Sequence, residues 1–531
     1  MSRGIGTIDV VAPEVKRPEQ LPPDAETSIW SRILGLLPVI APIALALVFI
    51  FSRLKFGEHA FLYEGALTLL ALICYISASV LLVTNLFVKE RVLDRLGLIT
   101  VGLGYSFGFA GWMIRWIEAG DKEGWLPGKL WRYFPLDNLY ALTLGFCCGA
   151  ALATLVIIRK PKYRALGALS MPIVSVILTL AICLGNEIRT LPPILDSYWR
   201  PIHVSIATVA YGVCLTSFGV AFAYLLKDGI RMDAIAVWVG LFGLLVFGTV
   251  GRFGVLTHLE YGASLFWMTN KESLDVRSPL PGVGPLMVLT LLAIVGFLIL
   301  FAVNWQKQDR EQTKWAWRLF GAATVLQALV LAVMFFQIKT VDSPASRIPE
   351  RELVSFGGWL QDQMKDNAPP MLSRADLAKE WLQGKGSDMK VNFNSDPVEF
   401  GALIGLFVAL LMVGLIAWKR EAVMSALPPI NSLDSLLYRT VGVAFPLLSM
   451  LLITGAVWAN ESWGRYWGWD SKEVGALVSW MAYAGYLHTR IAHGWRGRKS
   501  AYFALLGFVL VIFTWLGVSY LLPGLHSYAG V

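Results

Sequence analysis

The sequence is short of charged residues. Asp, Glu, Lys and Arg make up only 15% of its 531 residues, whereas soluble globular domains have about 25%. Hydrophobic residues reach 56%, so the composition indicates an integral membrane protein with many spans. The net charge of +8 is therefore interpreted as a bias of the connecting loops, and no nucleic-acid partner is expected.

Cysteine is also scarce, and its pattern excludes several kinds of site. All five cysteines lie in apolar runs and none forms a C-x-x-C pair, which argues against a disulfide framework, a thiol relay or a zinc site. The first apolar run lacks a small-residue cleavage site and follows a polar, proline-rich tail. We therefore expect it to be a retained helix and not a signal peptide.

The apolar runs predict an all-α polytopic membrane protein with about 13 transmembrane helices. Basic residues recur in alternate loops, which by the positive-inside rule places the N-terminus in the cytoplasm and the C-terminus outside. The predicted spans lie near 33–51, 63–87, 96–117, 136–158, 165–184, 204–226, 234–256, 283–303, 318–339, 398–418, 440–460, 474–490 and 500–521.

The sequence predicts four segments, and the third of them contains a long external loop. The long external loop 340–397 should contain two amphipathic helices, near 349–366 and 373–383, and could be a docking platform or a solvated decoration. The predicted segments are a cytoplasmic tail at 1–32, an N-terminal membrane bundle at 33–226, inserted helices with the external loop at 227–430, and a C-terminal module at 431–531.

A cluster of indoles lies between two of the last spans. Trp463, Trp467 and Trp469 fall within seven residues, and their flat faces suit a large planar ligand such as haem. The alternative is an ordinary aromatic belt at the membrane interface. Asp470 and Glu473 form a D-x-x-E capping box, which is also a structural reason for the acid.

The predicted topology assigns each histidine to one side of the membrane or to a span. His203 and His526 both emerge on the external side with the indoles, and two imidazoles from distant parts of the chain could hold haem iron from both faces. His488 lies within a span, where an ionisable group indicates function unless it reaches the inner interface. His493 is expected to be solvated, and His59 and His258 lack aromatic company.

Two cations flank the indole cluster. Arg465 and Lys472 could pair with the two haem propionates through charge-assisted hydrogen bonds. They could equally extend to the membrane interface without any ligand.

These motifs resemble a known family. Trp463 to Glu473 is similar to the tryptophan-rich WWD signature of haem-handling membrane proteins. The longer stretch from Gly455 resembles the CcsA/ResC family, the synthase component of system II cytochrome c biogenesis. The resemblance continues through Tyr486-Leu-His488-Thr-Arg490, Gly494-Trp-Arg-Gly497 and Gly524-Leu-His526-Ser-Tyr528, and includes Ser197-Tyr-Trp199 and Ile202-His203-Val204.

The resemblance implies delivery of haem b and its covalent attachment to apocytochrome c at the outer face of a bacterial cytoplasmic membrane. His203 and His526 would be the external axial ligands, and His488 a membrane-embedded ligand of an earlier site. The implied partners are a CcsB/ResB-like membrane protein, an apocytochrome with a C-x-x-C-H motif and thiol-reducing proteins. The protein would then be a thioether-forming cytochrome c haem lyase with no protein nucleophile.

The sequence also departs from the family pattern. Asn138-Leu-Tyr140-Ala141 resembles an N-x-Y-E segment without its acid, Ser471 stands where proline is usual, and extra spans follow His203. Those spans could carry a missing membrane ligand, for which His258 is the least unsuitable residue. Alternatives are a haem transporter or chaperone without attachment activity, and a dihaem electron-transfer subunit, which should have histidine pairs within its spans.

Overall fold

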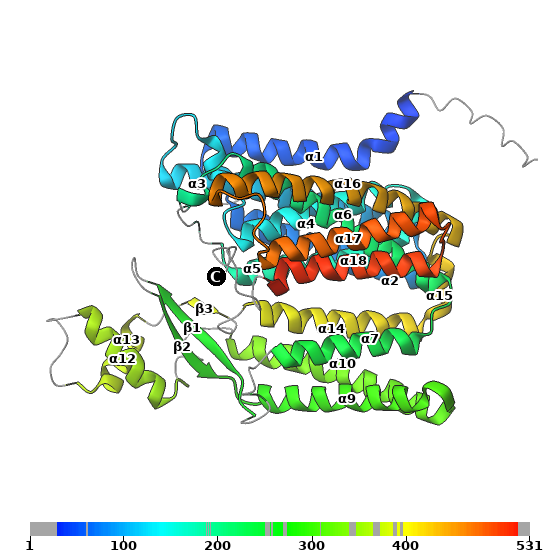
Figure 1. The fold of residues 1–531 in the computed structure, drawn as a ribbon. Helices are drawn as coiled ribbons and strands as arrows, with labels where there is room; N and C mark the ends of the chain where they lie inside the picture. The colour runs from blue at the N-terminus through cyan, green and yellow to red at the C-terminus, as the bar shows by residue number, and fades with distance from the viewer. Residues whose placement is uncertain are drawn as a thin grey trace, which may run out of the picture.

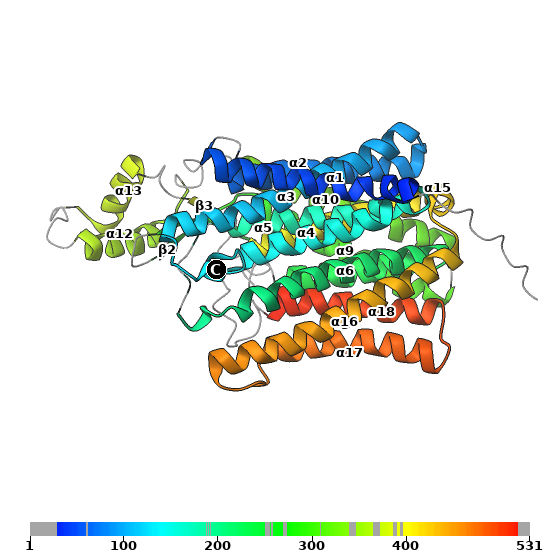
Figure 2. The same ribbon diagram turned by 90° about the horizontal axis from the view of Figure 1, so that it is seen from above.

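The computed structural model describes most of the chain as long helices that lie side by side (Figures 1 and 2). The described residues are 29–59, 62–186, 188, 191, 193–249, 255, 259–268, 273–307, 309–338, 347–364, 372–385, 390–392 and 397–518. The protein is nearly all helical, which confirms the predicted fold class.

The long helices account for every predicted span. They are α1 (Ile29–Phe56), α2 (Glu64–Val88), α3 (Arg91–Glu123), α4 (Leu139–Ile158), α5 (Gly167–Leu184), α6 (Trp199–Lys227), α7 (Met232–Thr249), α9 (Val283–Lys307), α10 (Arg310–Ile338), α14 (Pro397–Trp418), α16 (Ile430–Trp463), α17 (Ser471–Ala492) and α18 (Arg498–Ile512). Shorter helical segments are η1 (Leu130–Tyr133), η2 (Pro161–Leu166), η3 (Pro193–Leu195), α15 (Arg420–Ala426) and η6 (Phe513–Gly517).

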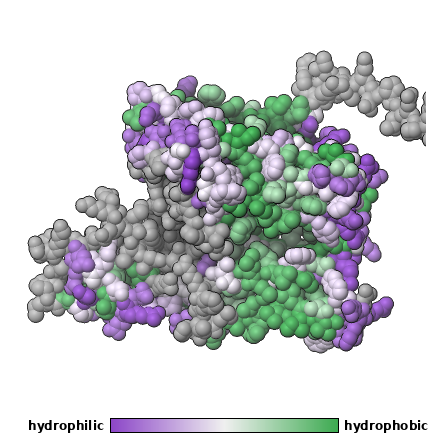
Figure 3. All heavy atoms as spheres, in the orientation of Figure 1, coloured by the Kyte–Doolittle hydropathy of each residue, from purple (hydrophilic) through white to green (hydrophobic). Residues whose placement is uncertain are grey.

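Twelve of the described helices are long and apolar enough to cross a membrane. The helix at the remaining predicted span, α17, has 22 residues but is less apolar and is not among the twelve. On the face that Figure 3 shows, apolar residues cover the middle of the bundle and hydrophilic residues gather toward its two ends. This distribution is typical of a protein whose middle faces lipid.

The two ends of the bundle differ, and we name them by their contents. A small unit of strands and helices lies at one end, called here the sheet end, and α15 lies at the other, called the α15 end (Figure 1). Because successive helices run in alternating directions, the Trp463–Asp470 turn lies at the sheet end. The basic connections after α2, α4, α6, α9, α14 and α17 all lie at the α15 end.

The unit at the sheet end contains strands that the sequence analysis did not predict. β1 (Gly262–Met268) pairs antiparallel with β2 (Ser273–Pro279) and with β3 (Lys390–Asn392), in the order β2-β1-β3. The two predicted amphipathic helices are present as α12 (Glu350–Met364) and α13 (Arg374–Lys385). Val276 of β2 packs into a small core with Phe356, Leu360 and Ala378 of these helices.

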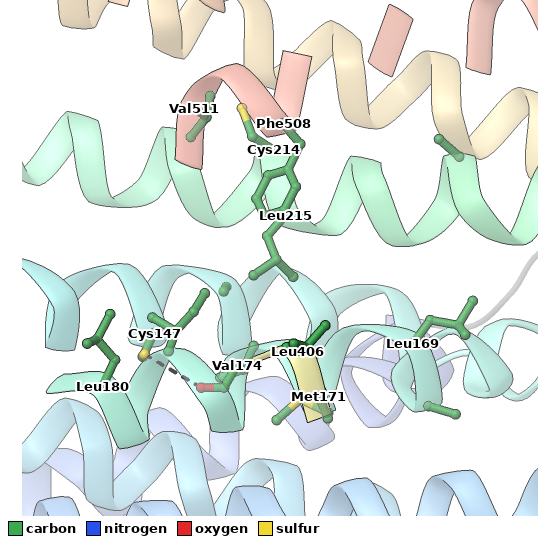
Figure 4. Close-up of a cluster of buried hydrophobic side chains, with 14 of the residues drawn as sticks. Cys147, Leu169, Met171, Val174, Leu180, Cys214, Leu215, Leu406, Phe508 and Val511 are labelled. Carbon is green, nitrogen blue, oxygen red and sulfur yellow. Dashed lines mark hydrogen bonds between the residues drawn. The ribbon is translucent and has the colours of Figure 1, made fainter. Parts of the chain in front are cut away.

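The centre of the membrane bundle is α6. It packs against α4, α16 and α18, while α5 joins this group to α14 and so to the bundle of α7, α9 and α10. Figure 4 shows the apolar core between these helices, where Cys214 and Leu215 of α6 lie near Phe508 of α18. In the neighbouring α4, the Cys147 thiol lies 3.9 Å from the Val174 carbonyl oxygen of α5.

The contact between α4 and α6 depends on two glycines. A Cβ atom added to Gly212 of α6 would lie 2.4 Å from the backbone nitrogen of Ala150 in α4, and one added to Gly149 would lie 2.7 Å from the Thr208 carbonyl oxygen. Small residues at such crossings let helix backbones approach within lipid, where no hydrophobic effect drives helices together.

We predict that Gly212→Leu separates α4 from α6 and destabilises the protein by about 2–3 kcal/mol or more, because the inserted side chain meets backbone atoms that cannot move aside. Thermal unfolding of the detergent-purified protein measures the effect. Gly321→Leu on α10 is the matched control, since a Cβ there meets nothing within 4 Å. Equal unfolding temperatures for the two variants would contradict the proposed close contact.

Candidate functional site

A cavity of about 150 Å³ lies at the sheet end of the bundle, between α4, α6, α16, the start of α17 and η6. His203 of α6, Trp463 and Trp467 line it together. Residues from four distant parts of the chain therefore meet at one partly open hollow. Four of the residues predicted for the haem site are among them: His203, Trp463, Trp467 and Lys472.

His203 lies in the second turn of α6, and its ring lies against α16. A Cβ on Gly455 would be 2.7 Å from the His203 Cε1 atom, so the imidazole occupies the space that a larger residue would fill. Its Nδ1 atom lies 3.3 Å from the Thr454 hydroxyl oxygen. An Nδ1 partner of this kind helps to fix the orientation of the ring.

An aromatic column continues from the imidazole along α16. The ring centroids of His203 and Trp458 are 5.7 Å apart, and those of Trp458 and Trp463 are 5.8 Å apart. Trp458 is buried and was not predicted as a site residue. Its spacing from Gly455 could have identified it, because residues i and i+3 lie on the same face of a helix and Trp458 therefore faces α6 together with Gly455.

The predicted indole cluster divides into two parts. Trp463 and Trp467 line the cavity, whereas Trp469 is 73% exposed and does not. The rings of Trp467 and Trp469 meet edge to face, with centroids 5.8 Å apart. Trp469 has a φ of 56°, a left-handed conformation that is strained for a bulky residue and is common at functional sites.

The capping box predicted at the start of α17 is present. The Asp470 side chain accepts a hydrogen bond from the Lys472 backbone N–H at 3.2 Å, and the backbone N–H of Asp470 donates to Glu473 Oε2 at 3.1 Å. Glu473 also accepts from the Gly468 N–H at 2.8 Å. These bonds hold the turn between Trp467 and Asp470, so Asp470 positions the indoles and does not line the cavity.

The two predicted cations lie differently. Lys472 and Glu473 line the cavity, while Arg465 is exposed and extends over Gly468. Lys472 precedes the apolar part of α17, and burial lowers the pKa of its ammonium group to about 8, although the nearby Asp470 carboxylate favours the charged form. A desolvated cation at this position is suited to pairing with an incoming carboxylate.

A set of polar contacts fixes the start of α6 and thereby His203. The Ser197 hydroxyl donates to Glu461 Oε2 at the end of α16 at 2.8 Å. The Asp196 carboxylate lies 2.9 Å from Lys129 Nζ and 3.2 Å from Arg132 Nη1. Burial alone would raise the pKa of Asp196, but these two cations outweigh it and hold the pKa below its usual value.

A buried ionic network lies behind the cavity wall that Asp137 and Asn138 form. Arg115 lies 4.0 Å from Glu64 Oε2 and 3.9 Å from Asp137 Oδ2, and both Arg115 and Glu64 are 1% exposed. The Tyr140 hydroxyl donates to Glu64. An acid from α2 therefore contacts the Asn138–Ala141 segment, which the sequence analysis did not identify.

The other histidines that the structure describes do not line this cavity. His488 is exposed on α17 toward the α15 end, with its ring centroid 5.3 Å from that of His493. His59 lies in the connection after α1 and does not line the cavity. His526 and His258 lie outside the described residues. The His203–His526 pairing therefore remains a prediction.

Comparison with known proteins now identifies the family. A profile of the family described as cytochrome C assembly protein matches residues 136–274 and 393–526. The chain belongs to that family. It is of the CcsA type, which confirms the resemblance found in the sequence, and it functions in cytochrome c assembly.

The curated relatives share different lengths of the chain. The chain is 32% identical to cytochrome c biogenesis protein CcsA of Guillardia theta over 266 residues, which cover 45% of this chain and 83% of that protein. It is 46% identical to CcsA of Chlamydomonas reinhardtii over 152 residues, covering 29% and 41%. For CcsA of Pyropia yezoensis, identity is 54% over 99 residues, covering 19% and 31%.

The family match and the cavity coincide. The cavity-lining residues fall in the two matched segments, whereas residues 275–392 lie between these segments and contain α9, α10, α12 and α13. The CcsA-type protein thus keeps its cavity in the shared part of the chain. The unit at the sheet end belongs partly to the part that is not shared.

We predict that Gly455→Ala lowers the yield of mature cytochrome c roughly tenfold, because the added methyl group displaces the His203 ring. The measurement is covalent haem staining of a reporter cytochrome in cells that depend on this protein. Gly442→Ala, on the same helix, is the matched control because its Cβ would meet nothing within 4 Å. If both variants gave the wild-type yield, Gly455 would have no role in positioning His203.

We predict opposite effects on stability and function at Trp469. Trp469→Gly should stabilise the fold by on the order of 1 kcal/mol, because glycine adopts a positive φ without strain, and should reduce cytochrome maturation because the indole is lost. Trp469→Phe keeps both the strain and an aromatic face, so it should retain more activity than the glycine variant. Full activity of Trp469→Gly would show that the exposed indole has no function.

Proposed function

We propose that the chain delivers haem to apocytochrome c and takes part in its covalent attachment at the cavity that His203, Trp463 and Trp467 line. The observation that carries this proposal is the meeting of an imidazole with a column of indoles, from helices far apart in the sequence, at one hollow. Flat indole faces suit a porphyrin, and a neutral imidazole is a common axial ligand of haem iron.

The cavity sits at the extracytoplasmic face of a bacterial cytoplasmic membrane in this proposal. Six basic connections lie at the α15 end, which by the positive-inside rule is then cytoplasmic. The sheet end, with its strands and α12 and α13, is external. An apocytochrome substrate would meet the cavity there.

The residues present fit haem as the transferred substrate. His203 would ligate the iron on one face, and His526 is the proposed ligand on the other. Lys472 and the exposed Arg465 would pair with the propionates. The cavity volume of about 150 Å³ is below the range of about 300–1,000 Å³ typical of small-molecule pockets, so the cavity would have to widen to admit a porphyrin.

The chemistry needs no nucleophile from the chain. Each cysteine thiol of the C-x-x-C-H motif adds across one haem vinyl group, so that sulfur bonds to carbon, the proton adds to the other vinyl carbon, and no group leaves. The protein's contribution is to orient haem and substrate, and to set the iron environment through its imidazole ligand. In that role the chain would act as a cytochrome c haem lyase.

His488 is proposed as the ligand of an earlier haem site within the membrane. It is exposed on α17 toward the α15 end, so a ligand on a neighbouring protein could reach the same iron. A CcsB/ResB-like membrane protein would supply that second ligand. Proteins that keep the substrate thiols reduced would complete the system.

The enzyme and carrier hypotheses differ in one measurable outcome. In cells that lack their own maturation system, this chain and a CcsB/ResB-like partner should yield covalent haem on a C-x-x-C-H reporter. A haem transporter or chaperone would bind haem but give no covalent product. Haem that co-purifies without any covalent cytochrome, with the partner present, would favour the carrier hypothesis.

We predict that His203→Ala changes the absorption spectrum of haem bound to the purified protein and lowers cytochrome maturation by tenfold or more, because one axial ligand is lost. Added imidazole should partly restore both, since it can occupy the space that the ring leaves. His59→Ala is the control, because His59 does not line the cavity. A wild-type spectrum for His203→Ala would refute the ligand assignment.

A further inference from the structure

A second hollow lies at the α15 end, between the end of α4 with η2 and the first three turns of α16. Its volume is about 480 Å³. Four cations line it, and no carboxylate does: Arg159, Lys160, Lys162 and Arg439. The proposed haem site includes none of the residues that line this hollow.

The nearby carboxylates are already paired with other cations. Asp434, next to the lining residue Ser435 on α16, forms a bidentate ion pair with Arg490, with distances of 2.6 and 2.8 Å. Asp94 accepts from Arg164 at 2.8 Å. Within the described part of the chain, no ion pair reaches Lys160, Lys162 or Arg439. The hollow therefore has a positive charge that no carboxylate among the described residues pairs with at these three side chains.

Hydrogen-bonding groups and an apolar wall complete the hollow. Ser432, Ser435 and Asn431 line it from α16, and all three can donate to an anionic oxygen. Val156 and Leu436 line it as well, and Val156 is 44% exposed on a helix that crosses the membrane. One ligand could therefore place an anionic group among the cations and an apolar chain along the helices.

Arg159 connects the hollow to a lipid-facing helix. Its Nη1 atom donates to the Gly35 carbonyl oxygen of α1 at 2.8 Å. The neighbouring Leu34 and Leu37 of α1 are 65% and 53% exposed. The hollow thus opens beside a surface that faces the bilayer, at the depth where lipid headgroups lie.

We propose that this hollow binds the phosphate headgroup of an acidic phospholipid. Basic pockets between transmembrane helices at this interface are suited to anionic headgroups, and each near-surface Lys or Arg contributes about 1 kcal/mol, or roughly fivefold, to the attraction. The ligand would bridge η2 and α16. These helices both pack on α6, whose opposite end carries His203.

The test compares lipid retention by the full-length protein in nanodiscs of phosphatidylcholine with added phosphatidylglycerol. Native mass spectrometry should show preferential retention of phosphatidylglycerol by the wild type. The triple variant K160Q/K162Q/R439Q should lose this preference by tenfold or more. The matched control K307Q/R310Q/R318Q removes the same charge at the same end of the bundle and should retain it.

Displacement of the bound lipid by phosphate, sulfate or haem distinguishes a lipid headgroup from other anions. Inorganic phosphate should displace the lipid no better than sulfate of equal ionic strength, because it lacks the apolar chains. Displacement by phosphate alone would make the hollow a site for a free anion, and displacement by equimolar haem would make it a haem-carboxylate site. Either result overturns the proposal, as does equal lipid retention by the triple and control variants.

A second variant protects the test against misfolding. Ser435→Phe fills the hollow and leaves all four cations in place, and Ser435 is exposed, so the fold should tolerate it. Loss of the phosphatidylglycerol preference in this variant supports a site of defined shape. An unchanged preference would mean that the cations act only as a diffuse surface charge, which contradicts the proposal.

Discussion

The close approach of α6 and α16 at Gly455 is the constraint on which the site depends. The His203 imidazole occupies the space that a side chain at position 455 would take. Because α16 continues directly into Trp463, this one contact sets the relation between the imidazole and the indoles. In lipid, small residues and interhelical hydrogen bonds decide such contacts, since no water is expelled when helices meet.

Polar contacts at the sheet end make that arrangement rigid. Ser197 links the start of α6 to the end of α16 through Glu461. Arg200, which is buried, donates to the carbonyl oxygens of Trp131 and Arg132 and so ties α6 to the connection before α4. A buried cation is costly unless its donors are satisfied, and these hydrogen bonds from the Arg200 guanidinium reduce that cost while they fix the start of α6.

The sequence predicted the parts of the fold that the bilayer dictates. A span requires about 20 apolar residues, so hydropathy located each crossing helix, and the D-x-x-E pattern located the start of α17. The strands β1, β2 and β3 were missed because short strands next to long apolar runs have no distinctive pattern, and β3 pairs with a strand over 100 residues earlier.

The sequence also predicted some residues of the site and missed others. His203, Trp463 and Trp467 were identified because topology places them at the same end of the bundle, and the structure brings them to one cavity. Trp458 was missed because the sequence does not show which helix packs against this face of α16, and a Trp within a span can equally face lipid. The partnership of Glu64 with Tyr140 was not predictable either, because it joins α2 to α4 across a contact that hydropathy does not specify.

The positions of the two described candidate ligands restrict the order of events. His488 is 16 residues after the cavity residue Lys472 on α17, and at 1.5 Å per residue the two lie roughly 24 Å apart. One iron cannot therefore be bound by His203 and His488 together in this arrangement of helices. If both imidazoles bind haem, they define two sites at different depths, and haem that passes from one to the other must exchange its ligands.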